Sequence, residues 1–210
     1  MSWSTIAVVF VIIFAIFNTQ QPIPSAVSSS SNQASYSEET SYEIKEQLDQ
    51  STPSLDANDM EAYQVIVSFI IEIYKGIPME DAFLIAEHTI RNCKKYGMDP
   101  FLMTALYSVE SSFNKMAVSS SGALGLGQLM PFNVKSYKVN EPFDIEQNIR
   151  GSVRMIYDML SMWNNDVPHA LASYYEGHNA IKRKYGQPFK QDTQAYVNKI
   201  LSRYETLKSY

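Results

Sequence analysis

From about residue 61, the sequence repeats apolar residues with the period of an α-helix, and capping residues separate the repeats. Residues 79–97 place acids in the first turn, lysines in the last turn and a glycine at the end, as a helix dipole and a C-cap favour. Asp99 and Pro100 then form an N-cap followed by proline at the first helical position. No stretch alternates in polarity over the length of a strand. We therefore expect a mainly α fold with at most a small β-hairpin, near residues 122–130.

The composition is typical of one globular domain with additional segments. The chain has 210 residues, of which 45% are hydrophobic and 12% aromatic, enough for one domain with its own core. Residues 1–60 hold one lysine and seven acids, whereas residues 61–210 hold 16 basic and 15 acidic residues. This near-neutral balance argues against a nucleic-acid partner. The single cysteine, Cys93, excludes an intramolecular disulfide.

The chain begins with a hydrophobic segment. Residues 6–17 are uninterrupted apolar residues, a length that is short for a membrane-spanning helix and typical of a signal-peptide core. We expect residues 1–17 to be a signal peptide or an uncleaved signal anchor. Residues 18–60 are rich in serine and acids and predict a disordered, polar linker, and residues 61–210 predict the folded domain. The protein is then exported to the cell envelope, either to the periplasm or to the outer face of the cytoplasmic membrane.

One carboxylate closes a strongly apolar helical pattern. Glu110 follows Val109, where burial and the negative end of the helix dipole both disfavour the charged form and raise its pKa. A carboxyl group protonated near neutral pH can donate a proton to a leaving oxygen. The glycines of residues 122–127 would let a polymer lie close to the backbone. Taken alone, these residues also fit a solvated helix end followed by an ordinary loop.

Residues 96–131 resemble the core of the soluble lytic transglycosylase (SLT) domain, a goose-type-lysozyme relative that cleaves peptidoglycan. The matching motifs are Glu110 to Asn114, Ala117 to Ser119, Gly122 to Pro131, Asp144 to Arg150, Ala170 to Gly177 and Gln194 to Val197. They occur in the family's order and cover about residues 63–205. The resemblance implies a lysozyme-like helical catalytic domain over residues 61–210.

The resemblance also implies a mechanism and a set of site residues. Glu110 would act as catalytic acid and then as base on the bond between N-acetylmuramic acid and N-acetylglucosamine, forming a 1,6-anhydro ring. The sugar's own N-acetyl group would stabilise the cation, so the second carboxylate of other glycosidases is not required. Ser119, Gln128, Met130 and Tyr174 correspond to substrate-binding residues of the family. No cofactor and no metal is implied, because the three histidines are isolated in the sequence.

Three positions depart from the family's pattern, and we expect them to modulate the site. Gly127 stands where the family has methionine, which predicts a loss of bulk in one wall of the groove. Tyr175 replaces asparagine, and Glu176 replaces a small residue. Glu176 has two predicted orientations: beside Glu110, where it would raise the pKa of that group and hold a water, or towards solvent. For Tyr196, in the last motif, packing is the expected role.

The leading interpretation is an exported peptidoglycan lytic transglycosylase. One alternative is a muramidase, which uses water and leaves a reducing sugar end. Another is a non-catalytic glycan-binding or scaffold protein of the envelope. The expected partners are peptidoglycan glycan strands, an envelope-spanning machine and, if residues 1–17 are retained, the membrane.

Overall fold

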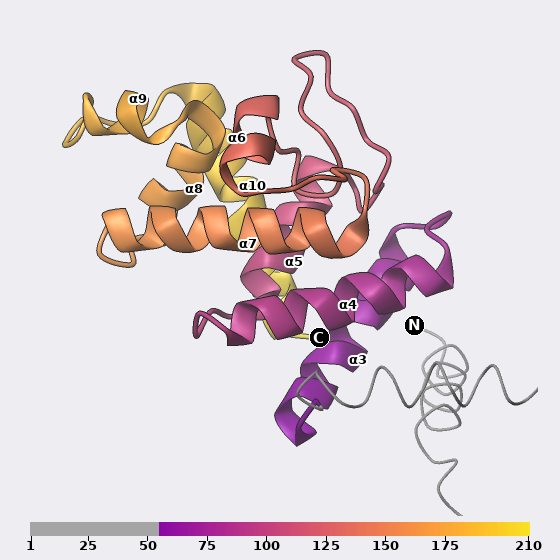
Figure 1. Cartoon of the computed structure of the whole chain (residues 1–210). Helices are drawn as coiled ribbons and strands as arrows, with labels where there is room; N and C mark the ends of the chain where they lie inside the picture. Colours follow the sequence, from indigo (N-terminus) through magenta and orange to yellow (C-terminus); the bar gives the residue numbers. More distant parts are fainter. Residues whose placement is uncertain (1–54) are drawn as a thin grey trace, which may run out of the picture. The chain divides into compact units, whose positions relative to one another are not determined.

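The computed structural model describes residues 55–210 (Figure 1). The predicted leader, residues 1–17, and residues 18–54 of the predicted linker lie outside the described residues. The first described helix begins at Ala57, earlier in the chain than the expected start at residue 61. No helix within the described residues is long and apolar enough to span a membrane.

The described part of the chain is mainly helical, as the sequence predicted. Its helices are α3 (Ala57–Ile73), α4 (Met79–Lys94), α5 (Pro100–Glu110), α6 (Pro131–Ser136), α7 (Ile145–Met162), α8 (Val167–Glu176), α9 (His178–Lys182) and α10 (Gln191–Lys208). The small hairpin expected near residues 122–130 is reduced to isolated antiparallel bridges, which pair Leu124 with Val118 and with Leu129.

Aspartates fix the starts of several helices. Asp56 and Asp59 form a capping box on α3, in which each carboxylate accepts the other's backbone N–H, at 3.0 and 3.1 Å. Asp99 and Asp144 each accept a backbone N–H from the first turn of their helix at 2.9 Å. The N-cap that the sequence predicted for α5 is therefore confirmed, and α7 begins with a cap of the same kind. Such caps each contribute about 1 kcal/mol.

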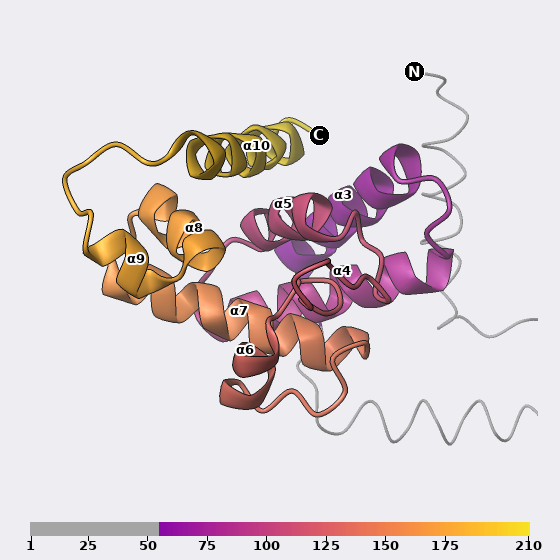
Figure 2. The same ribbon diagram turned by 90° about the horizontal axis from the view of Figure 1, so that it is seen from above.

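Helix α5 lies at the centre of the described fold. Figure 2 shows α10 on one side of α5, and α6 with the loop before it on the other. Residues 102–108 of α5 are all buried. The hydroxyl of Tyr107, fully buried, pairs with the hydroxyl of Ser152 on α7 at 2.8 Å, so this polar group is satisfied inside the core.

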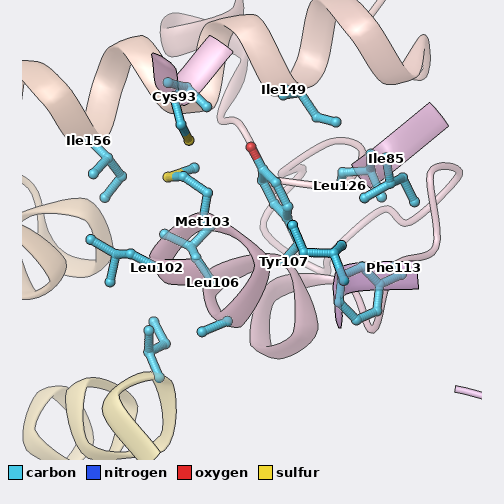
Figure 3. Close-up of a cluster of buried hydrophobic side chains, with 14 of the residues drawn as sticks. Ile85, Cys93, Leu102, Met103, Leu106, Tyr107, Phe113, Leu126, Ile149 and Ile156 are labelled. Atoms are coloured by element: carbon cyan, nitrogen blue, oxygen red, sulfur yellow. The ribbon is translucent and has the colours of Figure 1, made fainter. Parts of the chain in front are cut away.

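The core around α5 draws side chains from most elements (Figure 3). Neighbours of Met103, Leu106 and Tyr107 in this cluster are Ile85, Cys93, Leu102, Phe113, Leu126, Ile149 and Ile156. Helices α4 and α7 pack against each other, and α10 packs against α5. The end of α5 is therefore fixed from several sides, which matters because Glu110 is its last residue.

The packing of the core against α7 can be tested at Gly151, a glycine inside this helix. An added Cβ on Gly151 would lie 2.5 Å from Cγ2 of Val139 and 3.2 Å from Cδ1 of Leu129. Replacing a helical glycine by alanine usually stabilises a protein by up to about 1 kcal/mol. Gly151→Ala should instead lower the free energy of unfolding by about 1–3 kcal/mol, because the core there is already full.

Urea denaturation measures this difference. The control, Ser161→Ala, changes an exposed position of the same helix and should stay within about 0.5 kcal/mol of the parent protein. A stabilised Gly151→Ala variant would contradict the close approach of Val139 to α7.

Candidate active site

Glu110 ends α5 at the edge of the core. It is partly buried, and the hydroxyl of Tyr196 on α10 donates a hydrogen bond to its Oε1. Burial raises the pKa of Glu110 to about 7, and the hydrogen bond from Tyr196 opposes this increase by favouring the ionised form. The increase has the direction that the sequence predicted. Both protonation states of Glu110 are therefore populated near neutral pH.

The chain turns sharply after Glu110. Ser112 and Phe113 both adopt left-handed backbone conformations, with φ of 51° and 63°, which cost roughly 1–3 kcal/mol each for residues other than glycine. The buried ring of Phe113 packs edge-on against Tyr74, with ring centroids 4.8 Å apart. This packing offsets the backbone cost and directs the chain into the loop beside Glu110.

Residues 117–131, which we call the glycine strap, are held together by their own hydrogen bonds. The carbonyl of Ala117 accepts the N–H of Gly125 at 2.9 Å. The side-chain amide of Gln128 donates to the carbonyls of Ala117 and Gly125, at 3.2 and 2.9 Å. Gln128 thus cross-links the strap, and its predicted contact with substrate stays a prediction.

Asn148 on α7 anchors the strap to the helical core. Its Oδ1 accepts the N–H of Gly127 at 2.7 Å, and its Nδ2 donates to the carbonyls of Leu124 and Pro142 at 3.1 and 2.7 Å. The residue is buried, and its bond from the N–H of Gly127 lies inside the protein. Sequence reasoning missed Asn148, although it lies in the motif from Asp144 to Arg150.

Two strap glycines are required by packing against the protein itself. At Gly125, where φ is +73°, a Cβ would lie 2.3 Å from both Asn148 Nδ2 and the carbonyl oxygen of Pro142. At Gly127, a Cβ would lie 2.6 Å from Cβ of Ser152. The prediction that Gly127 removes bulk from the groove wall is therefore wrong, because the side-chain direction at this position points into α7.

Tyr174 joins the strap to α8. Its hydroxyl donates to the carbonyl of Gly127 at 2.5 Å. Burial first, and then the charge of Glu110, raise the pKa of Tyr174 well above its usual value, so the hydroxyl stays protonated as a donor. The structure thus brings Tyr174 into the electrostatic neighbourhood of Glu110 and into direct contact with the strap.

Tyr196 is the second residue that sequence reasoning missed. The sequence predicted a packing role, whereas the structure makes it the hydrogen-bond partner of Glu110. Burial and the charge of Glu110 keep the pKa of Tyr196 well above its usual value. Its place in the last family motif was the available signal, but a single sequence does not show that two positions 86 residues apart come into contact.

Ser119 and Met130 lie at other points of the strap. The hydroxyl of Ser119 accepts the N–H of Ala123 at 2.9 Å and closes a turn. Met130 is exposed and immediately precedes α6. Their roles as substrate contacts stay predictions.

Glu176 takes neither of its two predicted orientations. Its side chain is only 12% exposed, accepts a hydrogen bond from the hydroxyl of Thr193 and pairs with Lys190 Nζ at 3.0 Å. The hydrogen bonds from Thr193 and Lys190 lower the pKa of Glu176. Glu176 therefore ties the end of α8 to the start of α10, since its carboxylate is held by Thr193 and Lys190.

Residues 55–210 contain no group of three or more His, Cys, Asp or Glu side chains that could hold a metal ion.

Comparison with known proteins identifies the family. The transglycosylase SLT domain family matches residues 87–197, more than half of the chain, and the chain belongs to this family. It is 34% identical over 113 residues to a transglycosylase of Enterobacteria phage PRD1, covering 54% of this chain and 40% of the phage protein. It is 31% identical over 134 residues to the membrane-bound lytic murein transglycosylase C of Photorhabdus laumondii, covering 54% and 37%. The chain thus spans less than half the length of these relatives.

Solved structures share the fold. An inactive variant of the lytic transglycosylase Slt from Pseudomonas aeruginosa superimposes with a TM-score of 0.54 at 21% identity, over 73% of this chain and 29% of that one. The 70-kDa soluble lytic transglycosylase of Escherichia coli gives a TM-score of 0.50 at 16% identity, over 75% and 37%. The lysozyme-like fold that the sequence predicted is confirmed.

The raised pKa of Glu110 predicts that the stability of the fold depends on pH. The pKa of Glu110 rises from 4.5, its ordinary value in an unfolded chain, to about 7 in the folded state. Ionisation of this carboxyl group therefore lowers the stability of the fold as the pH increases from 4.5 to about 7. Glu110→Gln removes this charge, so the variant should be more stable than the parent at pH 8, by up to about 3 kcal/mol, and similar to it at pH 4.

Chemical denaturation at the two pH values measures this difference. The control, Glu61→Gln, removes a carboxylate from an exposed position and should show no comparable gain at pH 8. Equal stabilities of Glu110→Gln and the parent at pH 8 would contradict the burial of an ionisable Glu110.

Proposed function

We propose that this chain is a peptidoglycan lytic transglycosylase in which Glu110 is the only catalytic acid and base. The observation that carries the proposal is the carboxyl of Glu110, which has a pKa of about 7 at the end of a buried helix and accepts a hydrogen bond from Tyr196. Membership of the SLT family and relatives named as transglycosylases support the same activity.

The reaction begins with protonated Glu110. It donates its proton to the oxygen between N-acetylmuramic acid and N-acetylglucosamine as the bond from C1 to that oxygen breaks. The N-acetyl group of the muramic sugar stabilises the cation that forms. Ionised Glu110 then takes the proton of the C6 hydroxyl, and O6 bonds to C1 to close the 1,6-anhydro ring. No water is consumed, and Glu110 regains its proton.

Tyr196 acts on the ionised form of Glu110, which exists between the two proton transfers. Its hydroxyl donates to Glu110, and a hydrogen bond to a carboxylate is stronger than one to the neutral acid. Tyr196 therefore stabilises Glu110 after the first proton transfer. Tyr174 holds the strap through Gly127, so the strap, with Ser119, Gln128 and Met130, presents a fixed surface to the glycan.

The position of Glu176 favours ring closure over hydrolysis. A muramidase needs a water activated near the cation, and Glu176 was the candidate to hold it. Since Thr193, Lys190 and Lys184 occupy its carboxylate, Glu176 is not available for that role. The transglycosylase reaction needs no such group.

We also propose the cell envelope as the place of action. The support is the hydrophobic stretch of residues 6–17, within the segment 1–17 that we interpret as a signal peptide or membrane anchor, together with a relative named as membrane-bound. The partner is then the peptidoglycan glycan strand, alone or alongside an envelope-spanning machine.

Digestion of purified peptidoglycan tests the activity. The parent chain should release muropeptides that carry 1,6-anhydromuramic acid, identified by mass spectrometry. Glu110→Gln should lower the rate at least about a hundredfold, because general acid–base catalysis is lost, and the exposed-site variant Glu61→Gln should retain it. Products heavier by one water would mean a muramidase, and glycan binding without products would mean a non-catalytic protein.

The pH dependence tests the role of Tyr196. Because the cycle starts from protonated Glu110, kcat/KM should fall as pH rises through its pKa of about 7. Tyr196→Phe removes a hydrogen bond that favours the ionised form, so the pKa should increase and the alkaline limb should move to higher pH. The control is Tyr185→Phe, at a ring that is 70% exposed. An alkaline limb that stays in place, or moves to lower pH, would contradict this role.

A further inference from the structure

Tyr175 is an exposed aromatic ring beside the candidate catalytic pair. It is 51% exposed and stacks on Tyr196, with ring centroids 4.6 Å apart and an angle of 22° between the rings. Tyr196 in turn donates its hydrogen bond to Glu110. The ring of Tyr175 is therefore separated from the catalytic carboxyl by one side chain.

The stacking leaves one face of the ring available. Tyr196 covers one face of Tyr175, so the exposed surface belongs to the opposite face and the ring edges. The next residue, Glu176, is fixed to Thr193 and Lys190 at the start of α10. The ring is thus held in place before any ligand arrives, which lowers the entropy cost of binding.

We propose that the exposed face of Tyr175 is a stacking surface for a pyranose ring of the glycan, at a saccharide position adjoining Glu110. A pyranose has a face of C–H groups that can pack on an aromatic ring while its hydroxyls stay in water. The asparagine that the family has at this position offers no such flat surface. This inference rests on the proposed function, since it takes the ligand to be the glycan strand.

The position in the fold suits a long polymer. Helices α8 and α10 pack against each other, and in Figure 2 the glycine strap and α6 lie across α5 from α10. Glu110, the last residue of α5, is linked to the Tyr175–Tyr196 stack by its hydrogen bond from Tyr196. A sugar on Tyr175 extends the contact area beyond the scissile bond on the α8–α10 side.

Binding to a variant without turnover tests the proposal. The full 210-residue chain carrying Glu110→Gln is titrated by calorimetry with oligosaccharides of alternating N-acetylglucosamine and N-acetylmuramic acid. Adding Tyr175→Asn or Tyr175→Leu should weaken binding by about three- to tenfold, the loss expected for one aromatic stacking contact. Tyr175→Phe and Tyr175→Trp, which keep a flat ring, should bind within about twofold of the parent.

A second stacked tyrosine provides the matched control. Tyr185 is 70% exposed and stacks on Trp163 at 5.5 Å and 23°, whereas Tyr175 stacks on the hydrogen-bond partner of Glu110. Tyr185→Asn should leave glycan affinity unchanged. The variant Tyr175→Leu distinguishes stacking of a sugar on a flat ring from simple shielding of Tyr196. Leucine still shields Tyr196 from water but offers no ring.

The pH profile separates binding from positioning. If Tyr175 acts as a stacking surface, Tyr175→Asn in the active chain raises KM and leaves the alkaline limb in place. A shifted limb with unchanged KM would mean that Tyr175 only positions Tyr196, and would overturn the proposal. Unchanged affinity of Tyr175→Asn, or full affinity of Tyr175→Leu, would also overturn it.

The experiment distinguishes this inference from the proposed function. Release of anhydro products by the parent, with equal affinity in all Tyr175 variants, overturns the inference alone. No products from the parent and no binding by Glu110→Gln overturn the proposed function and the inference together.

Discussion

Burial of α5 is the constraint on which the rest of the site depends. Residues 102–108 are enclosed by the other helices, so the final residue of α5 is delivered to the core's edge in a fixed position. The same burial removes water from Glu110 and raises its pKa to about 7. An acid on a solvated helix end would have an ordinary pKa and no fixed direction. The packing that stabilises the fold therefore also prepares the proposed acid.

The strap beside Glu110 is fixed from within the protein. Asn148 binds it from α7, and Tyr174 binds it from α8. The glycines at 125 and 127 allow this close approach, since a Cβ at either position would overlap a neighbouring residue. A glycine-rich loop is thus held in one conformation by hydrogen bonds within the strap and from α7 and α8. Such rigidity suits a site that must hold a polymer against a single proton donor.

Aromatic residues from α8 and α10 complete the surroundings of Glu110. Tyr196 bonds the carboxyl, and Tyr175 stacks on Tyr196. Glu176 locks the two helices together through Thr193. Tyr175 and Glu176, which depart from the family's pattern, therefore both connect α8 to α10. Glu176 has a structural role, and the ring of Tyr175 faces the proposed glycan.

The sequence by itself determined the helices and the cap at Asp99, because period and capping act over a few neighbouring residues. It also indicated the direction of the pKa shift of Glu110, but the desolvation that raises this pKa comes from the packing of the helices. Tertiary structure alone decided that Tyr196 bonds Glu110 and that Asn148 holds the strap. It also decided where residues 127 and 176 point. These features join positions far apart in the chain, and one sequence contains no measure of which distant groups meet when the helices pack.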